Sequence, residues 1–229
     1  MLFDSTIILL IPAMLLSLYA QHKVQSTFNK YTKVASRKGQ TGVEVATQLL
    51  SAAGIRDVKV EATPGHLTDH YDPRDKTVRL SEAVYNQRSL AALGVAAHEV
   101  GHAVQHNQQY MPLAFRSGLF PVVNLGSKLS MPLLMIGLFM GYGGFGQWML
   151  YSGILLFSFV VLFQVVTLPV EFNASSRALE MLEGQRILSP EETEPARKVL
   201  NAAALTYVAA AIMAALNLIR FILIAKSRR

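Results

Sequence analysis

The sequence predicts a mostly α-helical membrane protein with about four transmembrane helices and a small α+β domain built around one histidine-containing helix. Two observations lead to this fold class. Of the 229 residues, 52% are hydrophobic and the mean hydropathy is +0.32, which is too apolar for a water-soluble domain of this size. The apolar residues also form four stretches long enough to cross a bilayer core: Leu2–Ala20, Gly118–Tyr142, Trp148–Val170 and Ala202–Ala225.

Polar sequence between these stretches divides the chain into five segments. We expect an anchor, a polar domain, a membrane hairpin, a short polar helical segment, and a last membrane helix with a basic tail. The predicted ranges are 1–20, 21–117, 118–170, 171–201 and 202–229. The first stretch is expected to stay as an anchor rather than be cleaved as a signal peptide, because it has no basic start, carries Asp4, and lacks an A-x-A site before Gln21.

The charges beside the first stretch predict the orientation in the membrane. Five basic residues follow it closely: Lys23, Lys30, Lys33, Arg37 and Lys38. By the positive-inside rule, this flank and the polar domain face the cytoplasm. If the fourth stretch also spans the membrane, the basic tail from Lys226 lies on the outer side, against this rule. Either the first flank then sets the orientation, or the last helix enters the membrane only in part. The net charge of +6 is better explained by anionic lipid headgroups than by nucleic acid.

The polar domain contains signals for one helix and two strands. Thr41 and Glu44 form a capping box, and Gly54 ends the helix predicted over residues 42–53. Alternating runs at 57–63 and 75–81 predict strands joined by a turn-rich connection. The second strand either offers its edge to an extended peptide or simply covers the helix that follows it.

The most informative motif is H-E-x-x-H, formed by His98, Glu99 and His102 within the predicted helix over residues 89–107. Residues four apart share one helix face, so both imidazoles can bind one Zn²⁺ ion. Zinc lowers the pKa of a bound water to about 7, and an adjacent carboxylate can accept its proton. A chance match is the alternative, but small apolar neighbours and the cost of burying Glu99 without a cation favour one zinc ion per chain.

A catalytic zinc usually has three protein ligands, so a third must lie elsewhere. Gln108 stands ten residues after His98, where metzincins have their third histidine, and this excludes that class. His106 continues the row, but it lies about 6 Å beyond His102 along the helix axis. It is therefore not expected to share the metal.

Glu171 is the better candidate for the third ligand. It follows the third apolar stretch, and the two intervening spans return it to the side of His98 and His102. Two histidines and a distant glutamate form the ligand set of gluzincin-type sites. Spacing alone leaves an equal alternative, in which Glu171 is an ordinary helix-start carboxylate near Pro169.

Other catalytic motifs are excluded. Gly141, Gly143 and Gly146 formally match G-x-G-x-x-G, but no strand precedes them, and the run GYGGFGQ is expected to be a turn between membrane helices. The sequence has no G-x-S-x-G motif. Without cysteine, the chain has no thiol nucleophile, cysteine metal ligand or disulfide.

Together these motifs resemble the YugP-like family of membrane zinc metallopeptidases. The resemblance rests on TFNKYTKV, GHLTDHYDPRDKTVRLS, VAAHEVGHAVQH, TLPVEFNASSRA and KVLNAAALTYVAAA, which are spread over nearly the whole chain. The chain is more distantly similar to membrane-bound M48 peptidases, which implies a zincin-like domain with Glu171 as the third ligand. It also departs from these families, because Ser175 stands where the M48 pattern has Asp, and Asn173 where YugP-like chains often have Asp.

The resemblance implies a multi-pass endopeptidase of the bacterial inner membrane that faces the cytoplasm and acts in membrane-protein quality control. A donor near the developing oxyanion is also needed. By residue type, the candidates are His66, His70, Tyr71 and Arg177, with Ser175 as a possible support of the zinc ligands. The alternative for His66, His70 and Tyr71 is that they belong to an ordinary turn-rich loop, in which Asp69 and His70 bind each other or the backbone.

Three functions from different classes fit the sequence. The leading one is hydrolysis of peptides or proteins, including membrane proteins, beside the lipid bilayer. A site-2-type intramembrane protease would need an aspartate ligand in a late span, but Asp75 is the last aspartate in the chain. A non-catalytic zinc-binding adaptor would have no need of Glu99. The sequence predicts neither the oligomeric state nor a nucleic-acid partner.

Overall fold

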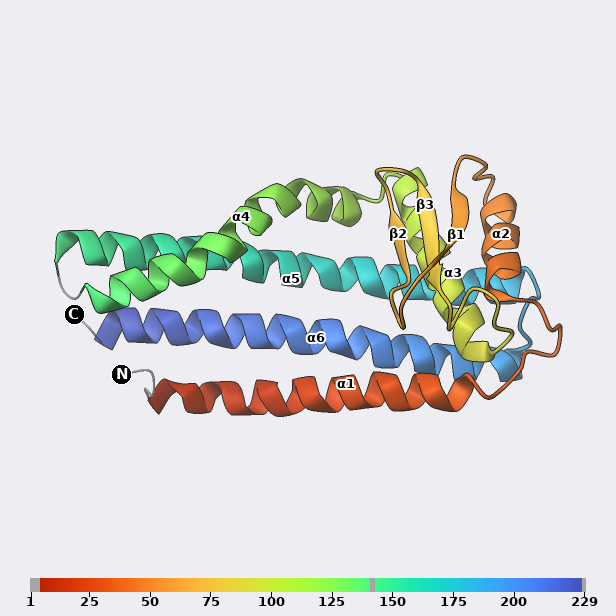
Figure 1. The fold of residues 1–229 in the computed structure, drawn as a ribbon, viewed down its shortest axis with the longest axis horizontal. Coiled ribbons are helices and arrows are strands. Elements are labelled where there is room, and N and C mark those ends of the chain that lie inside the picture. The colour runs from red at the N-terminus through yellow and green to blue at the C-terminus, as the bar shows by residue number, and fades with distance from the viewer. Residues whose placement is uncertain (1–4, 141–142, 228–229) are drawn as a thin grey trace. The chain divides into compact units, whose positions relative to one another are not determined.

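The computed structural model describes residues 5–140 and 143–227, and the chain in these ranges is mostly helical (Figure 1). A short 3-10 helix at Ser5–Leu10 precedes α1. The helices are α1 (Ile11–Tyr31), α2 (Gly42–Ala52), α3 (Leu90–Asn107), α4 (Met111–Phe139), α5 (Gly144–Gly184) and α6 (Pro190–Ser227). The strands are β1 (Lys59–Thr63), β2 (His70–Asp72) and β3 (Thr77–Ser81).

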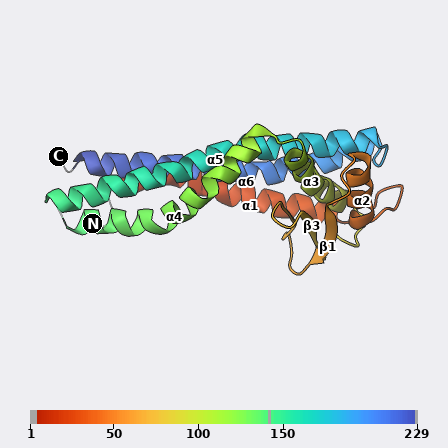
Figure 2. The same cartoon turned by 90° about the horizontal axis from the view of Figure 1, so that it is seen from above.

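The chain divides into two compact units. One comprises residues 1–20, 114–168 and 206–229, and the other comprises residues 21–113 and 169–205. The second unit contains the sheet, α2 and α3, together with the C-terminal part of α5 and the N-terminal part of α6. Figures 1 and 2 both show α2 and α3 beside the sheet. The H-E-x-x-H helix and the segment that carries Glu171 therefore belong to the same unit.

Four helical segments are long and apolar enough to cross a membrane: Thr6–Tyr31, Met111–Phe139, Gly144–Gly184 and Pro190–Ser227. The predicted number of membrane helices is confirmed. Each helix extends beyond its predicted apolar stretch, because helical sequence continues into the polar segments. Residues Leu2–Asp4 of the predicted anchor and Arg228 and Arg229 of the tail lie outside the described residues.

The predicted glycine-rich turn is wrong in its second half. Gly144–Gln147 forms the first turn of α5, whereas Gly141 and Tyr142 lie outside the described residues. Nearby glycines serve helix packing instead. A Cβ at Gly137 would lie 2.5 Å from the Leu150 nitrogen, and one at Gly153 would lie 2.9 Å from the Leu134 nitrogen. The small residues therefore let α4 and α5 approach closely, as in other membrane helix pairs.

The core of the second unit forms around α3. Leu93, Ala96, Ala97 and Val100 of α3 are fully buried and pack in one cluster with residues of α2, β3, α5 and α6. The predicted helix α2 is confirmed, including its capping box. The Thr41 hydroxyl accepts from the Glu44 nitrogen, and the Glu44 carboxylate accepts from the Thr41 nitrogen at 2.7 Å.

The three strands form a small sheet in the order β1–β3–β2. β1 and β3 are parallel with Val60 opposite Val78, and β2 and β3 are antiparallel with Tyr71 opposite Val78. Both predicted strands are confirmed. The expectation of a turn-rich connection missed β2, because three residues are too few to display an alternating pattern. The suggestion that β3 offers its edge is also wrong, since β1 and β2 pair with its two sides.

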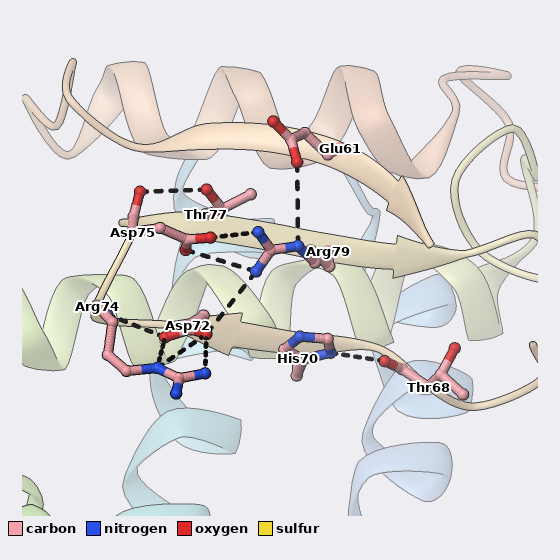
Figure 3. A network of polar contacts seen from close by, with 8 residues as sticks. All are labelled: Glu61, Thr68, His70, Asp72, Arg74, Asp75, Thr77 and Arg79. Atoms are coloured by element: carbon pink, nitrogen blue, oxygen red, sulfur yellow. Dashed lines mark hydrogen bonds and ion pairs between the residues drawn. The ribbon is translucent and has the colours of Figure 1, made fainter. Parts of the chain in front are cut away.

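A layer of charged residues covers the outer face of the sheet (Figure 3). The Arg79 guanidinium pairs with Asp75 and lies 3.9 Å from carboxylate oxygens of Asp72 and Glu61. Asp72 also accepts a 2.6 Å hydrogen bond from Arg74, and this contact holds the pKa of the Asp72 carboxyl well below its usual range. Val78 and Leu80 are buried on β3. The sheet therefore has a charged outer face, with α2 and α3 behind it.

We expect the stability contributed by Asp72 to be lost in acid. Its pKa is lower in the folded chain than the unfolded value of about 3.9, so the ionised form stabilises the fold above that pH. The stabilisation disappears as the pH falls toward the lower folded pKa. The check is thermal unfolding of the detergent-solubilised, chelator-treated protein between about pH 7 and about pH 3.

The comparison uses Asp72→Asn, which should lose less thermal stability on acidification than the wild type. Glu180→Gln, at an exposed position on α5, is the matched control and should follow the wild type. Equal loss in the wild type and in Asp72→Asn would contradict a stabilising charge at Asp72.

Candidate metal centre

Three side chains from two helices converge in the second unit. The Nε2 atoms of His98 and His102 on α3 lie 3.3 Å and 3.4 Å from Oε2 of Glu171 on α5. One ligand atom from each of the three residues lies within 4.8 Å of the others. Among the described residues, this is the one group of three histidine, cysteine or acidic side chains close enough to hold a metal ion.

The geometry of the three side chains suits zinc. Ligand atoms about 2.0–2.1 Å from a tetrahedral zinc ion are themselves about 3.3 Å apart. The two imidazole-to-carboxylate distances agree with this separation. All three side chains are largely buried, with at most 13% of their surface exposed. Two imidazoles and one carboxylate in a partly dry site form a ligand set typical of catalytic zinc.

The helix α3 presents both histidines on one face. It begins after the N-cap residue Ser89, whose hydroxyl accepts from the Ala92 nitrogen at 3.2 Å. Because His98 and His102 are four residues apart, their rings lie on one helix face and meet edge to face, with centroids 4.7 Å apart. The H-E-x-x-H residues therefore lie within α3, and local helical geometry alone brings the two histidines together.

A close contact between helix backbones places Glu171, the candidate third ligand. At Gly101, a Cβ atom would lie only 2.6 Å from the carbonyl oxygen of Ala174 on α5. At Gly94, a Cβ atom would lie 3.4 Å from the Ala196 Cβ on α6. The small residues on α3 therefore allow α5 and α6 to pack directly against it. Glu171, which lies one turn before Ala174 along α5, is brought to the histidines by this contact.

Glu171 does not stand at the start of a helix. It lies well inside α5, which begins at Gly144 and continues through Pro169. The alternative of an ordinary helix-start carboxylate is therefore wrong. One turn later on α5, the Ser175 hydroxyl lies 3.1 Å from Nδ1 of His98. The serine that replaces the expected aspartate thus contacts one of the two histidines.

Glu99 is buried beside the histidines. Only 7% of its surface is exposed, and burial raises the pKa of its carboxyl, although nearby His98 and His102 oppose the shift. Its position next to His98 in the sequence is fixed by the motif. A carboxyl group held in this environment is suited to accept a proton and release it again.

A hydrogen-bonded row of side chains supports the second histidine. Nδ1 of His102 lies 3.0 Å from Oε1 of Gln105, whose amide nitrogen donates to Asn173 at 2.9 Å. Asn173 also accepts from Nε of Arg177 at 2.7 Å. Arg177 was one of the expected candidates for the oxyanion donor, whereas no role was expected for Gln105. The available signal for Gln105 was a polar residue one turn after His102, directly after the apolar pair Ala103 and Val104.

The contacts of Arg177 lie within this row. Its Nη1 donates to Gln108 at 2.6 Å, and its guanidinium carbon lies 5.8 Å from the centre of the Tyr110 ring. Together with the contact to Asn173, these interactions occupy two of its three nitrogens and one face of its guanidinium. The structure therefore places Arg177 as a support of the α3–α5 contact.

The other predicted donors have partners elsewhere among the described residues. The Tyr71 hydroxyl lies 2.8 Å from Nδ1 of His106. Burial and nearby aspartates raise the pKa of Tyr71 to about 12, so the phenol stays protonated and donates. His70 is exposed, with Nδ1 2.8 Å from the Thr68 carbonyl, and the His66 ring meets the Phe28 ring edge-on at 5.6 Å. None of these described contacts involves the three converging side chains.

Asp69 and His106, in the same region, also have contacts outside the three converging side chains. Asp69 accepts from the nitrogen and hydroxyl of Ser81 at 2.7 Å and 2.9 Å. It therefore does not use His70 as its partner, and the backbone alternative applies to His70. His106 lies outside the group of three converging side chains, as its distance along the helix predicts.

Comparisons with known proteins agree with a zinc site. Residues 6–226 match the protein family described as "Putative neutral zinc metallopeptidase". The chain is also 48% identical over 218 residues to "Putative membrane protease YugP" of Bacillus subtilis (strain 168), with 95% of each chain covered. No solved structure matches the chain. The resemblance inferred from the sequence motifs is confirmed by both matches.

We expect Gly101→Ala to damage the metal site without touching a ligand. The added Cβ would meet the Ala174 carbonyl at 2.6 Å, so α3 and α5 must separate. Overpacking of this kind typically costs about 1–3 kcal/mol of folding free energy. Thermal unfolding and zinc affinity of the purified variant provide the check, and both should decrease.

Gly184→Ala, at the end of the partner helix α5, is the matched control, because no atom lies within 4 Å of the added Cβ. It should bind zinc as the wild type does. Unchanged zinc affinity in Gly101→Ala would show that the close helix contact does not set the site geometry.

Proposed function

Because the chain belongs to the neutral zinc metallopeptidase family that residues 6–226 match, we propose that it is a membrane-bound zinc endopeptidase. The observation that carries this proposal is the convergence of His98, His102 and Glu171 from α3 and α5. The four apolar helices and the similarity to a membrane protease support a location in a membrane. Peptide or protein chains are the proposed substrates.

The proposed mechanism divides the work among four side chains. His98, His102 and Glu171 hold one zinc ion, which when bound supplies Lewis-acid activation of a water molecule and of the substrate carbonyl. Glu99 accepts the proton that the attacking water loses. It then carries this proton to the nitrogen of the leaving amine, which releases the two peptide products. Glu99 is close enough to His98, His102 and Glu171 to interact with them electrostatically, which keeps its carboxylate beside the proposed metal position.

The edge of β2 is the proposed binding place for an extended substrate. β3 is paired on both sides, whereas β2 pairs with β3 on one side only among the described strands. β2 also lies against α3, with Tyr71 within reach of His106. An extended peptide that adds to this edge would satisfy its backbone groups through hydrogen bonds with little dependence on its sequence.

The cellular setting is likewise part of the proposal. The basic flank from Lys23 to Lys38 supports an orientation with the sheet-containing unit in the cytoplasm. We place the protein in the inner membrane of a bacterium, where it contacts the lipid bilayer. Membrane proteins are the proposed substrates, and their quality control is the proposed role.

The structure disfavours the site-2-type alternative. α3, which carries the H-E-x-x-H motif, is not among the helices that are apolar enough to span a membrane in the described part of the chain. An intramembrane protease would have its motif within such a span. The adaptor alternative predicts that the site binds zinc but that Glu99 has no catalytic role. Substitution of Glu99 therefore distinguishes the adaptor from the enzyme.

Glu99→Gln should retain zinc and lose proteolysis. The substitution keeps the shape of the side chain but removes the group that accepts the proton, which should reduce the rate about 10²- to 10⁴-fold. Zinc content of detergent-purified protein and cleavage of an unfolded, casein-like protein provide the measurements. Wild type should contain about one zinc per chain.

Glu171→Ala should lose both zinc and proteolysis, because it removes a ligand. Glu180→Gln, at an exposed position on the same helix, is the control and should behave as wild type. Full zinc in Glu171→Ala would show that the third ligand is another residue. Equal proteolysis in wild type and Glu99→Gln would contradict the proposed role of Glu99.

A further inference from the structure

Gln105 is a fully buried polar residue one turn after His102 on α3. Its side-chain nitrogen donates two hydrogen bonds, one to the Val170 carbonyl at 2.8 Å and one to Oδ1 of Asn173 at 2.9 Å. Its side-chain oxygen lies 3.0 Å from Nδ1 of His102. The carboxamide therefore uses both of its donor hydrogens on α5 and directs its acceptor to the histidine.

This arrangement determines which nitrogen of His102 carries the proton. A backbone carbonyl only accepts hydrogen bonds, so the amide nitrogen of Gln105 must face Val170. The opposite end of the amide, its oxygen, then faces His102 and can only accept. Nδ1 of His102 must therefore be the protonated nitrogen. Nε2, which lies 3.4 Å from Glu171, is left with the lone pair that a metal ion requires.

Asn173 and Arg177 hold Gln105 in this orientation. The guanidinium of Arg177 has only donors, and its Nε donates to Oδ1 of Asn173 at 2.7 Å. The same oxygen accepts from Gln105, so the asparagine amide has one favourable orientation. Arg177 is itself fixed by Gln108 and by the ring of Tyr110. Arg177, Asn173, Gln105 and His102 form a row of hydrogen bonds. In this row, each hydrogen bond fixes the donor and acceptor of the next one.

The other histidine has no equivalent constraint. Nδ1 of His98 lies 3.1 Å from the Ser175 hydroxyl, which can either donate or accept. The serine is therefore compatible with both neutral forms of the imidazole. The two histidines of the motif thus differ, and only His102 has its protonation fixed by its partner.

We propose that Gln105, backed by Asn173 and Arg177, is a positioning residue that fixes the ring orientation and the protonated nitrogen of His102. The proposal rests on the proposed function, because it assigns these residues to the metal centre of that enzyme. Partners of this kind behind a metal ligand typically change metal affinity about 10- to 100-fold when removed. Gln105 acts through His102 and does not touch the substrate.

The first test compares zinc affinities, measured by competition with a chelator on the detergent-purified full chain. Gln105→Met has a similar volume but no acceptor, so affinity should fall about 10- to 100-fold. Gln48→Met, at a partly buried glutamine on α2, is the control and should match wild type. Thermal unfolding of the chelator-treated proteins reports any general loss of fold separately from the loss of metal affinity.

A second pair of variants tests the backing residue. Asn173→Asp keeps an oxygen that accepts from both Gln105 and Arg177, so its zinc affinity should stay close to wild type. Asn173→Leu removes this acceptor and should lower the affinity. Thermal unfolding of the chelator-treated variants separates the two roles, because a merely structural role of Asn173 would lower the stability of Asn173→Leu without a specific loss of zinc affinity.

A direct observation uses wild type alone, labelled with ¹⁵N-histidine and loaded with zinc. The spectrum should show a proton on Nδ1 of His102. A proton on Nε2, or wild-type zinc affinity in Gln105→Met, would overturn the inference while the metal centre remains. Failure of wild type to bind zinc would overturn the proposed function and this inference together.

Discussion

The candidate site depends on how closely two helix backbones approach each other. The H-E-x-x-H motif supplies two candidate ligands from α3, but the third candidate comes from α5, and a side chain such as Glu171 has a short reach. Gly101 removes the Cβ that would otherwise meet the Ala174 carbonyl at 2.6 Å. The alanine-rich face of α3 and the buried residues Ala178 and Leu182 of α5 extend the same contact. Packing of small residues therefore sets the distance between ligands that lie far apart in the sequence.

This packing also concentrates charge in a poorly solvated place. Glu99 and Glu171 are both buried within one small region that also holds two imidazoles. Burying carboxylates away from water is costly unless a positive charge lies nearby. A divalent cation would balance both carboxylates, and the imidazoles would bind it as neutral ligands. The charge arrangement and the ligand geometry therefore favour the same occupant.

The features that could be predicted from the sequence are those that depend on residues close together in the chain. Helical spacing placed His98 and His102 on one face, and Thr41 with Glu44 marked a helix start that the structure reproduces. The parity of membrane spans and a family resemblance were needed for Glu171, because no local pattern links it to the motif. The sequence missed β2, which is too short to alternate, and did not single out Gln105, whose partners Val170 and Asn173 become neighbours only when α3 and α5 pack.

The central claim is that one metal ion binds His98, His102 and Glu171. The most direct measurement is zinc X-ray absorption of the purified, zinc-loaded wild type. The account predicts nitrogen and oxygen neighbours at about 2.0–2.1 Å, with the outer-shell pattern of two imidazoles. His102→Ala, which removes a ligand, should not retain zinc at this site. A wild-type spectrum without imidazole scattering, or a full complement of zinc with an unchanged spectrum in His102→Ala, would contradict the account.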